Sequence, residues 1–289
     1  MKRLFCLALC ALLFTVSCLA EGLPLADFSD AWADRFLPAG SVPERTDTGY
    51  RSDSLSVTVR SFRYLSSDVY VADIYIKDLH RLRRGFGGGA WGKKSQTISR
   101  IAEAEGAVLA LSGDNSQVLS QGAAFGNGEL LRRTTNRKRQ LCLIMNDGEM
   151  HILEGKEVSK EDILALSGQV WQSFLFGPAL LDGQGGALTE FVSGVKPANP
   201  RAVIGYYAPG HYAFVLVDGR GTKSLIESGQ KNKGLTMKEL SALAQELGFT
   251  QAYNLDGGQS ASIWFNGRVL SNPYHGGRAI GDILYLAEP

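Results

Sequence analysis

The stretch QAYNLDGGQSASIWFNG, from Gln251 to Gly267, carries the pattern that decides the fold. A short apolar run stops before Asp256, two glycines follow, and a second apolar run begins at Ile263. These runs predict two strands, and Asn266-Gly267 predicts a tight hairpin turn after the second. Asp256 therefore either makes an ordinary turn or places a carboxylate at a strand end, where a rigid scaffold holds it accessible.

Capped amphipathic segments predict the helices around this stretch. Thr236 followed by Glu239 forms a capping box, and leucines then repeat at helical spacing until Gly248. Ser159 begins a second, short helix in SKEDILALSG, with an acid three residues later. A third helix is expected over residues 95–106, because its apolar residues are in phase and its last glycine suits a left-handed C-cap.

Apolar runs and turn dipeptides predict the remaining strands. The segment LCLIMNDGEMHIL turns at residues 146–148, and RAVIGYYAPGHYAFVLVDGR turns at Pro209-Gly210. Further strands are expected from Leu55, in VYVADIYIKDL and in AIGDILYL. Strands and helices do not alternate regularly. We therefore predict an α+β fold, a single domain with a mixed, largely antiparallel sheet and three or four packing helices.

The N-terminus has the pattern of an export signal. Lys2 and Arg3 precede an apolar segment that is too short to span a bilayer, and small residues lead to a predicted cleavage after Ala20. The alternative is a lipoprotein anchored at Cys18. We assign residues 1–20 to a signal peptide, 21–50 to an N-terminal lead-in with apolar residues at helical spacing, and 51–289 to the main domain. The expected location is secreted or cell envelope.

Charge argues against some partners. The 289-residue chain has a formal net charge of +1, which gives no support for a nucleic-acid partner or a polybasic membrane contact, and no second segment looks transmembrane. The segment HRLRRGFGGGAWGKK is basic at both ends but lacks the strand and helix of a phosphate-binding fingerprint. It is expected to be a solvated loop or a basic lid over an anionic substrate. Oligomeric state cannot be inferred from the sequence.

Two segments end a predicted strand with an acid beside glycine. One runs helix, glycine and strand to Gly113-Asp114, and the other runs in the same order to Asp256. Two carboxylates from separate elements can flank one bond, as glycoside hydrolysis commonly requires. Asp-Gly is also a frequent turn sequence, so a structural role for each acid remains open.

Longer motifs resemble a known family. The combination of RAVIGY, FVLVDGR, the capped helix before NLDGGQSAS, and GGRAIGDILYL is similar to the phosphodiester glycosidase family. GAVLALSGDNS and FGPALLDG resemble its earlier segments, so the likeness covers roughly residues 95–286. Three positions depart from the family pattern: Ser112, Asn115 and Gln259.

This resemblance implies a chemistry and a set of residues. The family's reaction is cleavage of a sugar 1-phosphodiester on the sugar side, so the implied partner is a carbohydrate-phosphate substrate, with no cofactor and no metal. The catalytic residues would be Asp114 and Asp256. The substrate-binding candidates are Arg201, Asp218, Asn254, Gly257, Gly258, Ser260 and Arg278.

The arginines and the smaller polar residues have structural alternatives. Arg201 and Arg278 suit phosphate because a guanidinium can bind two oxygens at once, but either could form an ion pair or anchor backbone carbonyls. Asp218 could contact substrate hydroxyls or only make a turn. Asn254 and Ser260 could bind sugar or phosphate, or bond locally to the glycine loop.

Three other functions remain to be weighed. A serine hydrolase is disfavoured because Gly258–Ser262 reads G-x-S-x-S with no helix signal after it. A metal hydrolase lacks the HExxH motif, although Asp114, Asn115 or Asp256 could hold Ca²⁺. A non-catalytic cell-envelope glycan-binding protein that keeps the family fold is motivated by Ser112 and Asn115.

Overall fold

The computed structural model describes residues 24–191 and 194–288. The predicted signal peptide, with the alternative anchor at Cys18, lies outside the described residues. Every strand pairing within the described residues is antiparallel, and three α-helices occur there, which confirms the α+β prediction at its lower helix count. No helix in that part of the chain is long and apolar enough to span a bilayer.

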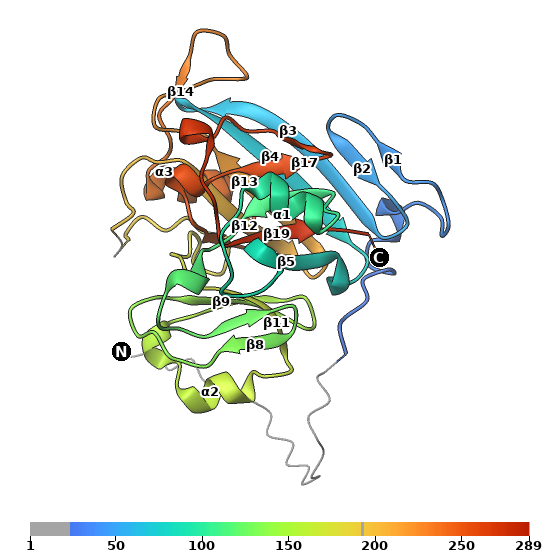
Figure 1. The fold of residues 1–289 in the computed structure, drawn as a ribbon, viewed down its shortest axis with the longest axis vertical. Coiled ribbons are helices and arrows are strands. Elements are labelled where there is room, and N and C mark those ends of the chain that lie inside the picture. Colours follow the sequence, from blue (N-terminus) through green and yellow to red (C-terminus); the bar gives the residue numbers. More distant parts are fainter. Residues whose placement is uncertain (1–23, 192–193, 289) are drawn as a thin grey trace.

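A seven-stranded sheet forms the largest layer (Figure 1). Its central strand contributes Val71 to one face and Ala72 to the other, and both side chains are buried because both faces are covered. The strands, in spatial order, are β1 (Glu44–Arg45), β2 (Gly49–Arg51), β3 (Leu55–Tyr64), β4 (Ser67–Ile76), β13 (His211–Val217), β12 (Arg201–Ala208) and β16 (Gln251–Asn254).

A five-stranded sheet packs on one face of the first. Leu111, Phe265 and Leu284 from this sheet share a core with Phe214 of the seven-stranded sheet. Its strands, in spatial order, are β18 (Arg268–Val269), β17 (Ile263–Phe265), β6 (Leu109–Ser112), β19 (Asp282–Leu286) and β5 (Leu82–Phe86).

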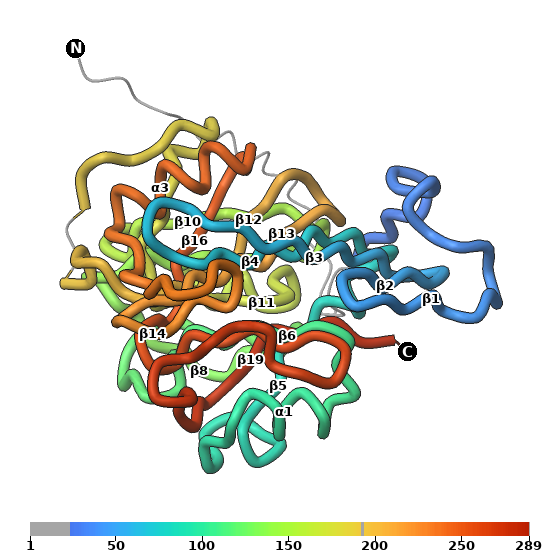
Figure 2. The backbone as a smooth tube through the Cα atoms, turned by 90° about the horizontal axis from the view of Figure 1, so that it is seen from above, coloured from blue at the N-terminus to red at the C-terminus, as the bar shows by residue number. Residues whose placement is uncertain are grey.

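Two helices complete a four-layer arrangement. Helix α3 (Met237–Glu246) buries Leu240 and Leu243 against the free face of the seven-stranded sheet. Helix α1 (Ile98–Ala104) packs Ile101 on the outer face of the five-stranded sheet. Figure 2 shows α3 and α1 at opposite sides, with the two sheets between them.

A smaller unit flanks these layers. Strands β10 (Met150–Leu153), β9 (Leu141–Met145) and β11 (Val170–Phe174) form a three-stranded sheet, covered by α2 (Lys160–Ala165). The remaining short strands pair as β7 (Ala124–Gly126) with β8 (Glu129–Arg132) and β14 (Thr222–Lys223) with β15 (Lys231–Asn232).

Two sequence expectations are corrected by the structure. The helical spacing over residues 25–36 gives only a short 3-10 turn, Ala33–Arg35, because Phe28 and Phe36 are buried from an irregular segment. The basic, glycine-rich segment is not wholly a solvated loop, since its first half forms β5. Leu82 and Arg84 are buried there while Arg83 between them is exposed, as the alternation of a strand requires.

Candidate active site

Two acid-bearing loops meet where the sheets lie together. The loop after β16 carries Asp256 and crosses from the seven-stranded to the five-stranded sheet at β17. The loop after β6 carries Gly113 and Asp114. The amide of Asp256 donates a hydrogen bond to the carbonyl of Gly113 at 3.2 Å, so the two loops are in direct contact.

Asp256 lies in a cluster with Ser260 and Arg278. The Ser260 hydroxyl donates to Asp256 Oδ2 at 2.6 Å, and Arg278 Nη2 donates to the same oxygen at 2.8 Å. Arg278 Nε donates to Ser260 Oγ at 2.6 Å, which closes the triangle. The Arg278 side chain is 47% exposed and that of Asp256 is 11% exposed, so the cluster reaches the surface.

The two glycines after Asp256 allow close approach by other groups. A Cβ on Gly257 would lie 2.5 Å from the carbonyl oxygen of Pro200. Gly258 has a φ of +62°, and a Cβ there would lie 2.8 Å from Nη2 of Arg220. Only glycine fits both positions without displacing a neighbour.

Arg220 is a second cation at this loop that the sequence motifs did not single out. It follows Asp218 in FVLVDGR, is exposed, and packs its guanidinium over the Tyr274 ring at 5.3 Å from the centroid. Arg220 Nε donates to Asn199 Oδ1 at 2.9 Å, which leaves its other nitrogens near Gly258. Arg220 is the last residue of the motif FVLVDGR, so the motif itself contained the residue that could have been picked out.

Asp114 is sealed within a different network. Its side chain is completely buried and accepts hydrogen bonds from the amides of Leu175 at 2.6 Å and Ser116 at 3.1 Å. It also pairs with the guanidinium of Arg84. Although backbone bonds join the two loops, Asp114 and Asp256 share no side-chain partner within the described residues.

Arg84 is the centre of that network. Its Nε donates to Asp282 Oδ2 at 2.8 Å and its Nη1 donates to the carbonyl of Ser173 at 2.9 Å. Burial alone would lower the pKa of Arg84, but the carboxylates of Asp114 and Asp282 outweigh it and raise that pKa. The guanidinium therefore stays charged and balances two buried acids.

Gly113 and the network also depend on each other. A Cβ on Gly113 would lie only 2.1 Å from Asp282 Oδ2, so the Gly-Asp pair of the loop packs against this carboxylate. Arg84 and Asp282 were both missed in the sequence. Arg84 is one of several basic residues in its segment, and Asp282 lies within an apolar strand, so neither sequence context marked the residue as part of a site.

Arg201 is bound to backbone carbonyls. Its Nε donates to Leu235 O at 2.9 Å and its Nη2 donates to Val195 O at 2.7 Å and to Pro197 O. Burial, with a smaller contribution from Arg220, lowers the pKa of Arg201 to about 10. These contacts match the carbonyl anchor, which was the structural alternative for Arg201, while the Arg201 backbone lies against Gly257.

Asn254 and Asp218 are also buried at this edge of the sheet. Asn254 Nδ2 donates to Gly177 O at 2.8 Å, while its Oδ1 has no hydrogen-bond partner within the described residues. Asp218 Oδ2 accepts from the Asn272 amide at 2.9 Å, and burial raises the pKa of Asp218 to about 7. Neither group contacts the Asp256 cluster in the hydrogen bonds of the structure.

The arrangement argues against a cation site at Asp114. The position that Ca²⁺ would need beside this carboxylate holds the Arg84 guanidinium, and the other oxygen accepts an amide. Across residues 24–191 and 194–288, no group of three or more His, Cys, Asp or Glu side chains is placed to share a metal ion.

Comparison with known proteins connects this geometry to a family. The profile of the phosphodiester glycosidase family matches residues 101–287, more than half of the chain. That range contains Asp114, Asp256 and Arg278, and it excludes Arg84.

Individual relatives are more distant. The SPbeta prophage-derived uncharacterized protein YomE of Bacillus subtilis (strain 168) is 26% identical over 153 residues, covering 52% of this chain and 22% of that protein. The chain therefore spans less than a quarter of the length of this curated relative.

Two solved structures share the fold. The zebrafish N-acetylglucosamine-1-phosphodiester alpha-N-acetylglucosaminidase catalytic domain, auto-inhibited by its pro-peptide, superposes with a TM-score of 0.63 at 19% identity, covering 93% of this chain and 96% of that one. A hypothetical protein from Synechocystis gives a TM-score of 0.54 at 14% identity, covering 86% and 64%.

Proposed function

Because the chain belongs to the phosphodiester glycosidase family, we propose that it hydrolyses a sugar 1-phosphodiester, with Asp256 as the catalytic carboxylate. The observation that carries this proposal is the cluster of Asp256, Ser260 and Arg278 beside two obligatory glycines. It combines a largely buried carboxylate, a hydroxyl and a half-exposed cation within hydrogen-bonding distance, and these groups suit cleavage of a glycosyl phosphate.

The chemistry follows from where the charges lie. Arg278 and Arg220 flank the glycine loop, so both can neutralise a phosphate bound there. In the reaction, water attacks the anomeric carbon, the bond from that carbon to the phosphate oxygen breaks, and the phosphomonoester leaves with the electron pair. A phosphate held by two cations is a good leaving group, which reduces the need for a general acid.

The two aspartates then have different roles. Asp256 stabilises the positive anomeric centre or takes the proton of the attacking water. Asp114 acts as a positioning residue, since its buried bonds to the amides of Ser116 and Leu175 fix the loop whose Gly113 carbonyl holds the Asp256 amide. This assigns one catalytic carboxylate, where the sequence suggested a pair.

Location completes the proposal. The predicted signal peptide would export the chain, so we propose a secreted or cell-envelope enzyme that acts on an envelope or extracellular glycan. Mass spectrometry of the mature N-terminus tests this part: a chain beginning after Ala20 supports a soluble exported protein, and a lipidated Cys18 supports the anchored alternative.

Asp256→Asn tests the catalytic assignment. We expect this variant of the purified protein to lose about 10²–10⁴-fold in release of free sugar from a sugar 1-phosphodiester, because an amide cannot serve as base or stabilise the cation. The matched control is Asp30→Asn, an exposed aspartate in the N-terminal segment, which should keep full activity. Undiminished turnover by a folded Asp256→Asn protein would contradict the assignment.

A glycan-binding protein without catalysis is the second candidate. It is favoured by the burial of Asp114, which leaves the accessible cluster with one carboxylate. This candidate predicts that a panel of sugar 1-phosphodiesters binds, with calorimetric heats, but releases no sugar. Turnover of any member of the panel excludes it.

A further inference from the structure

A basic loop borders a cavity of about 630 Å³ in the described part of the chain. The segment from Arg132 to Arg139 reads RRTTNRKR, with five cationic side chains among eight residues and no acid. Such a density is unusual for a chain whose formal net charge is only +1. A local excess of one sign attracts an oppositely charged ligand.

The end of this loop lines two hollows. Arg137, Lys138 and Arg139 contribute to a cavity of about 630 Å³, together with Phe176 and the Gly177–Ala179 segment. The same three residues line a second hollow of about 430 Å³, with Gln121 and Asn136. Arg137, Lys138 and Arg139 therefore form a basic ridge between two adjoining hollows. Such a surface suits an extended ligand.

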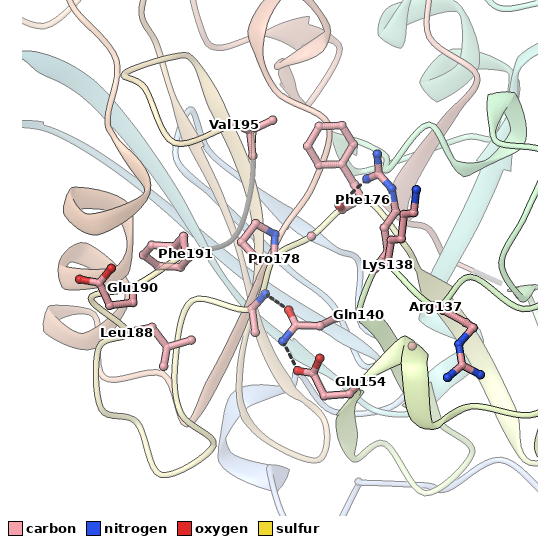
Figure 3. Close-up of a pocket in the computed structure, with 15 residues that line it drawn as sticks. Arg137, Lys138, Gln140, Glu154, Phe176, Pro178, Leu188, Glu190, Phe191 and Val195 are labelled. Carbon is pink, nitrogen blue, oxygen red and sulfur yellow. Dashed lines mark hydrogen bonds between the residues drawn. The ribbon is translucent and has the colours of Figure 1, made fainter.

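The charges at this ridge are not neutralised by the protein. Arg137 and Lys138 are exposed, and neither takes part in an ion pair within residues 24–191 and 194–288. The cavity also has two acids: Glu190 lies 3.4 Å from Lys238, and Glu154 accepts a hydrogen bond from the neutral amide of Gln140 at 2.7 Å and keeps its charge. Figure 3 shows Arg137 and Lys138 on one side of the cavity and Glu190 on the other.

The loop is held in place and is not a free tail. Arg139 Nη1 donates to Phe176 O at 2.7 Å, and its guanidinium packs over the Phe176 ring at 5.8 Å from the centroid. A Cβ on Gly155 would lie 2.0 Å from Arg139 O, so the strand connection beneath packs tightly against the loop. A preorganised cationic ridge loses little freedom when it binds an anion.

The same cavity wall contacts the strand that leads into the candidate active site. Gly177 lines the cavity, and its carbonyl accepts from the side chain of Asn254, two residues before Asp256. Leu175, just before this wall, donates its amide to Asp114. The segment that lines the cavity therefore also supports both acid loops.

We propose that Arg137 and Lys138 bind the anionic continuation of the substrate, a linear glycan with repeating phosphodiester groups. The identity of the bond that is cleaved rests on the proposed function. The binding of the polymer rests on the basic side chains at this loop alone. A chain of phosphates can place one anion in each hollow beside Arg137 and Lys138, whereas a diester with a single phosphate offers one anion only. The ridge thus selects polymer over short substrate.

The test compares Arg137→Gln/Lys138→Gln with the parent protein. The probe is a purified linear glycan whose sugar units are joined by phosphodiester groups, and binding is measured by calorimetry at low and at high salt. We expect about 10-fold weaker binding of the polymer at low salt, with the difference shrinking as salt screens the charges. The KM for a short sugar 1-phosphodiester should stay unchanged in the double variant.

The matched control removes the same charge elsewhere. Arg83 and Arg100 are exposed on β5 and α1, so Arg83→Gln/Arg100→Gln should bind the polymer like the parent. An equal loss in this control would show a general charge effect and overturn the proposal. Equally tight binding of an oligonucleotide of the same charge would also overturn the glycan assignment.

The outcomes separate this proposal from the proposed function. Polymer binding that falls only in Arg137→Gln/Lys138→Gln supports the ridge even if no diester is hydrolysed. Hydrolysis with unchanged polymer binding in that double variant supports the proposed function and rejects the ridge.

Discussion

Two aspartates with similar sequence contexts differ in what surrounds them. Asp256 shares its carboxylate with a hydroxyl and a half-exposed arginine. The carboxylate oxygens of Asp114 already accept hydrogen bonds from a buried arginine and two backbone amides. A carboxylate with a replaceable, solvent-reaching partner can change its contacts during a reaction, whereas one fixed in a buried network cannot without losing stability. This contrast is why catalysis is assigned to Asp256.

Asp218 gives a pH-dependent prediction. Burial raises its pKa to about 7, above the ordinary value of about 3.9 in the unfolded chain. The stabilising contribution of the protonated form is complete below the unfolded pKa and is lost as pH rises through about 7. Asp218→Asn stays neutral, so we expect its stability relative to the parent to rise by about 2–3 kcal/mol from pH 5 to pH 8.

Chemical denaturation at several pH values measures this difference. The Asn272 amide can still donate to the asparagine oxygen, so the fold should be preserved. Asp30→Asn is the control, because an exposed carboxylate should give a pH-independent difference. A flat Asp218→Asn difference across this range would mean that the carboxyl is already ionised in the folded protein.

The sequence pointed to some members of the site and missed others for a physical reason. Asp256, Ser260 and the two glycines lie within one local motif, so their proximity was available from the chain itself. Arg278 was found through a family resemblance. Arg84 and Asp282 meet Asp114 only through the pairing of β5, β19 and β6, and long-range strand order has no local signature.

At the scale of single elements, sequence patterns predicted a feature correctly where both interacting residues or strands lie in one short segment. The hairpin turns between β9 and β10, β12 and β13, and β17 and β18 occur where turn dipeptides predicted them. The capping boxes at Thr236 and Ser159 are both present. The helical spacing of apolar residues over 25–36 produces no α-helix, because tertiary burial of aromatic side chains gives the same spacing without one.

Thr236→Ala should weaken helix α3. The Thr236 hydroxyl accepts from the Glu239 amide at 3.3 Å, and the Glu239 carboxylate accepts from the Thr236 amide at 2.8 Å. Removing the hydroxyl leaves a helix N-terminal amide without its cap, and we expect a loss of about 1 kcal/mol in the free energy of unfolding. Urea titration measures this loss, with enzymatic activity unchanged below the transition.

Thr236→Ser is the matched control for the cap. Serine keeps the hydroxyl and removes only a methyl group, so its stability should lie close to that of the parent. Equal losses in the alanine and serine variants would assign the effect to packing of the methyl group and not to capping.

At the scale of the whole molecule, the Arg84 network joins elements of several layers. Arg84 comes from β5, Asp282 from β19, Asp114 from the loop after β6, and the Ser173 carbonyl from β11 of the flanking sheet. One buried cation therefore fixes the five-stranded sheet, the three-stranded sheet and the acid loop together. The candidate site depends on this frame, because Gly113 receives the Asp256 amide.

Arg84→Met tests this role. Removing the cation leaves two buried carboxylates without a counter-charge, and breaking a buried pair in this way costs about 3–5 kcal/mol. We expect a loss of that size in urea titration and a large fall in activity even below the unfolding transition, because the acid loop loses its anchor. Arg83→Met, at the exposed neighbouring position, should change neither quantity.

A second variant separates lost charge from lost packing. In Arg84→Met/Asp114→Asn/Asp282→Asn, no buried carboxylate remains unpaired, so we expect part of the stability to return. Activity should stay low, since the asparagines no longer hold the loop against a fixed cation. If the triple variant is as unstable as Arg84→Met, the loss comes from a packing defect around the methionine. If Arg84→Met keeps full activity, the acid loop is held without this network and Asp114 has no positioning role.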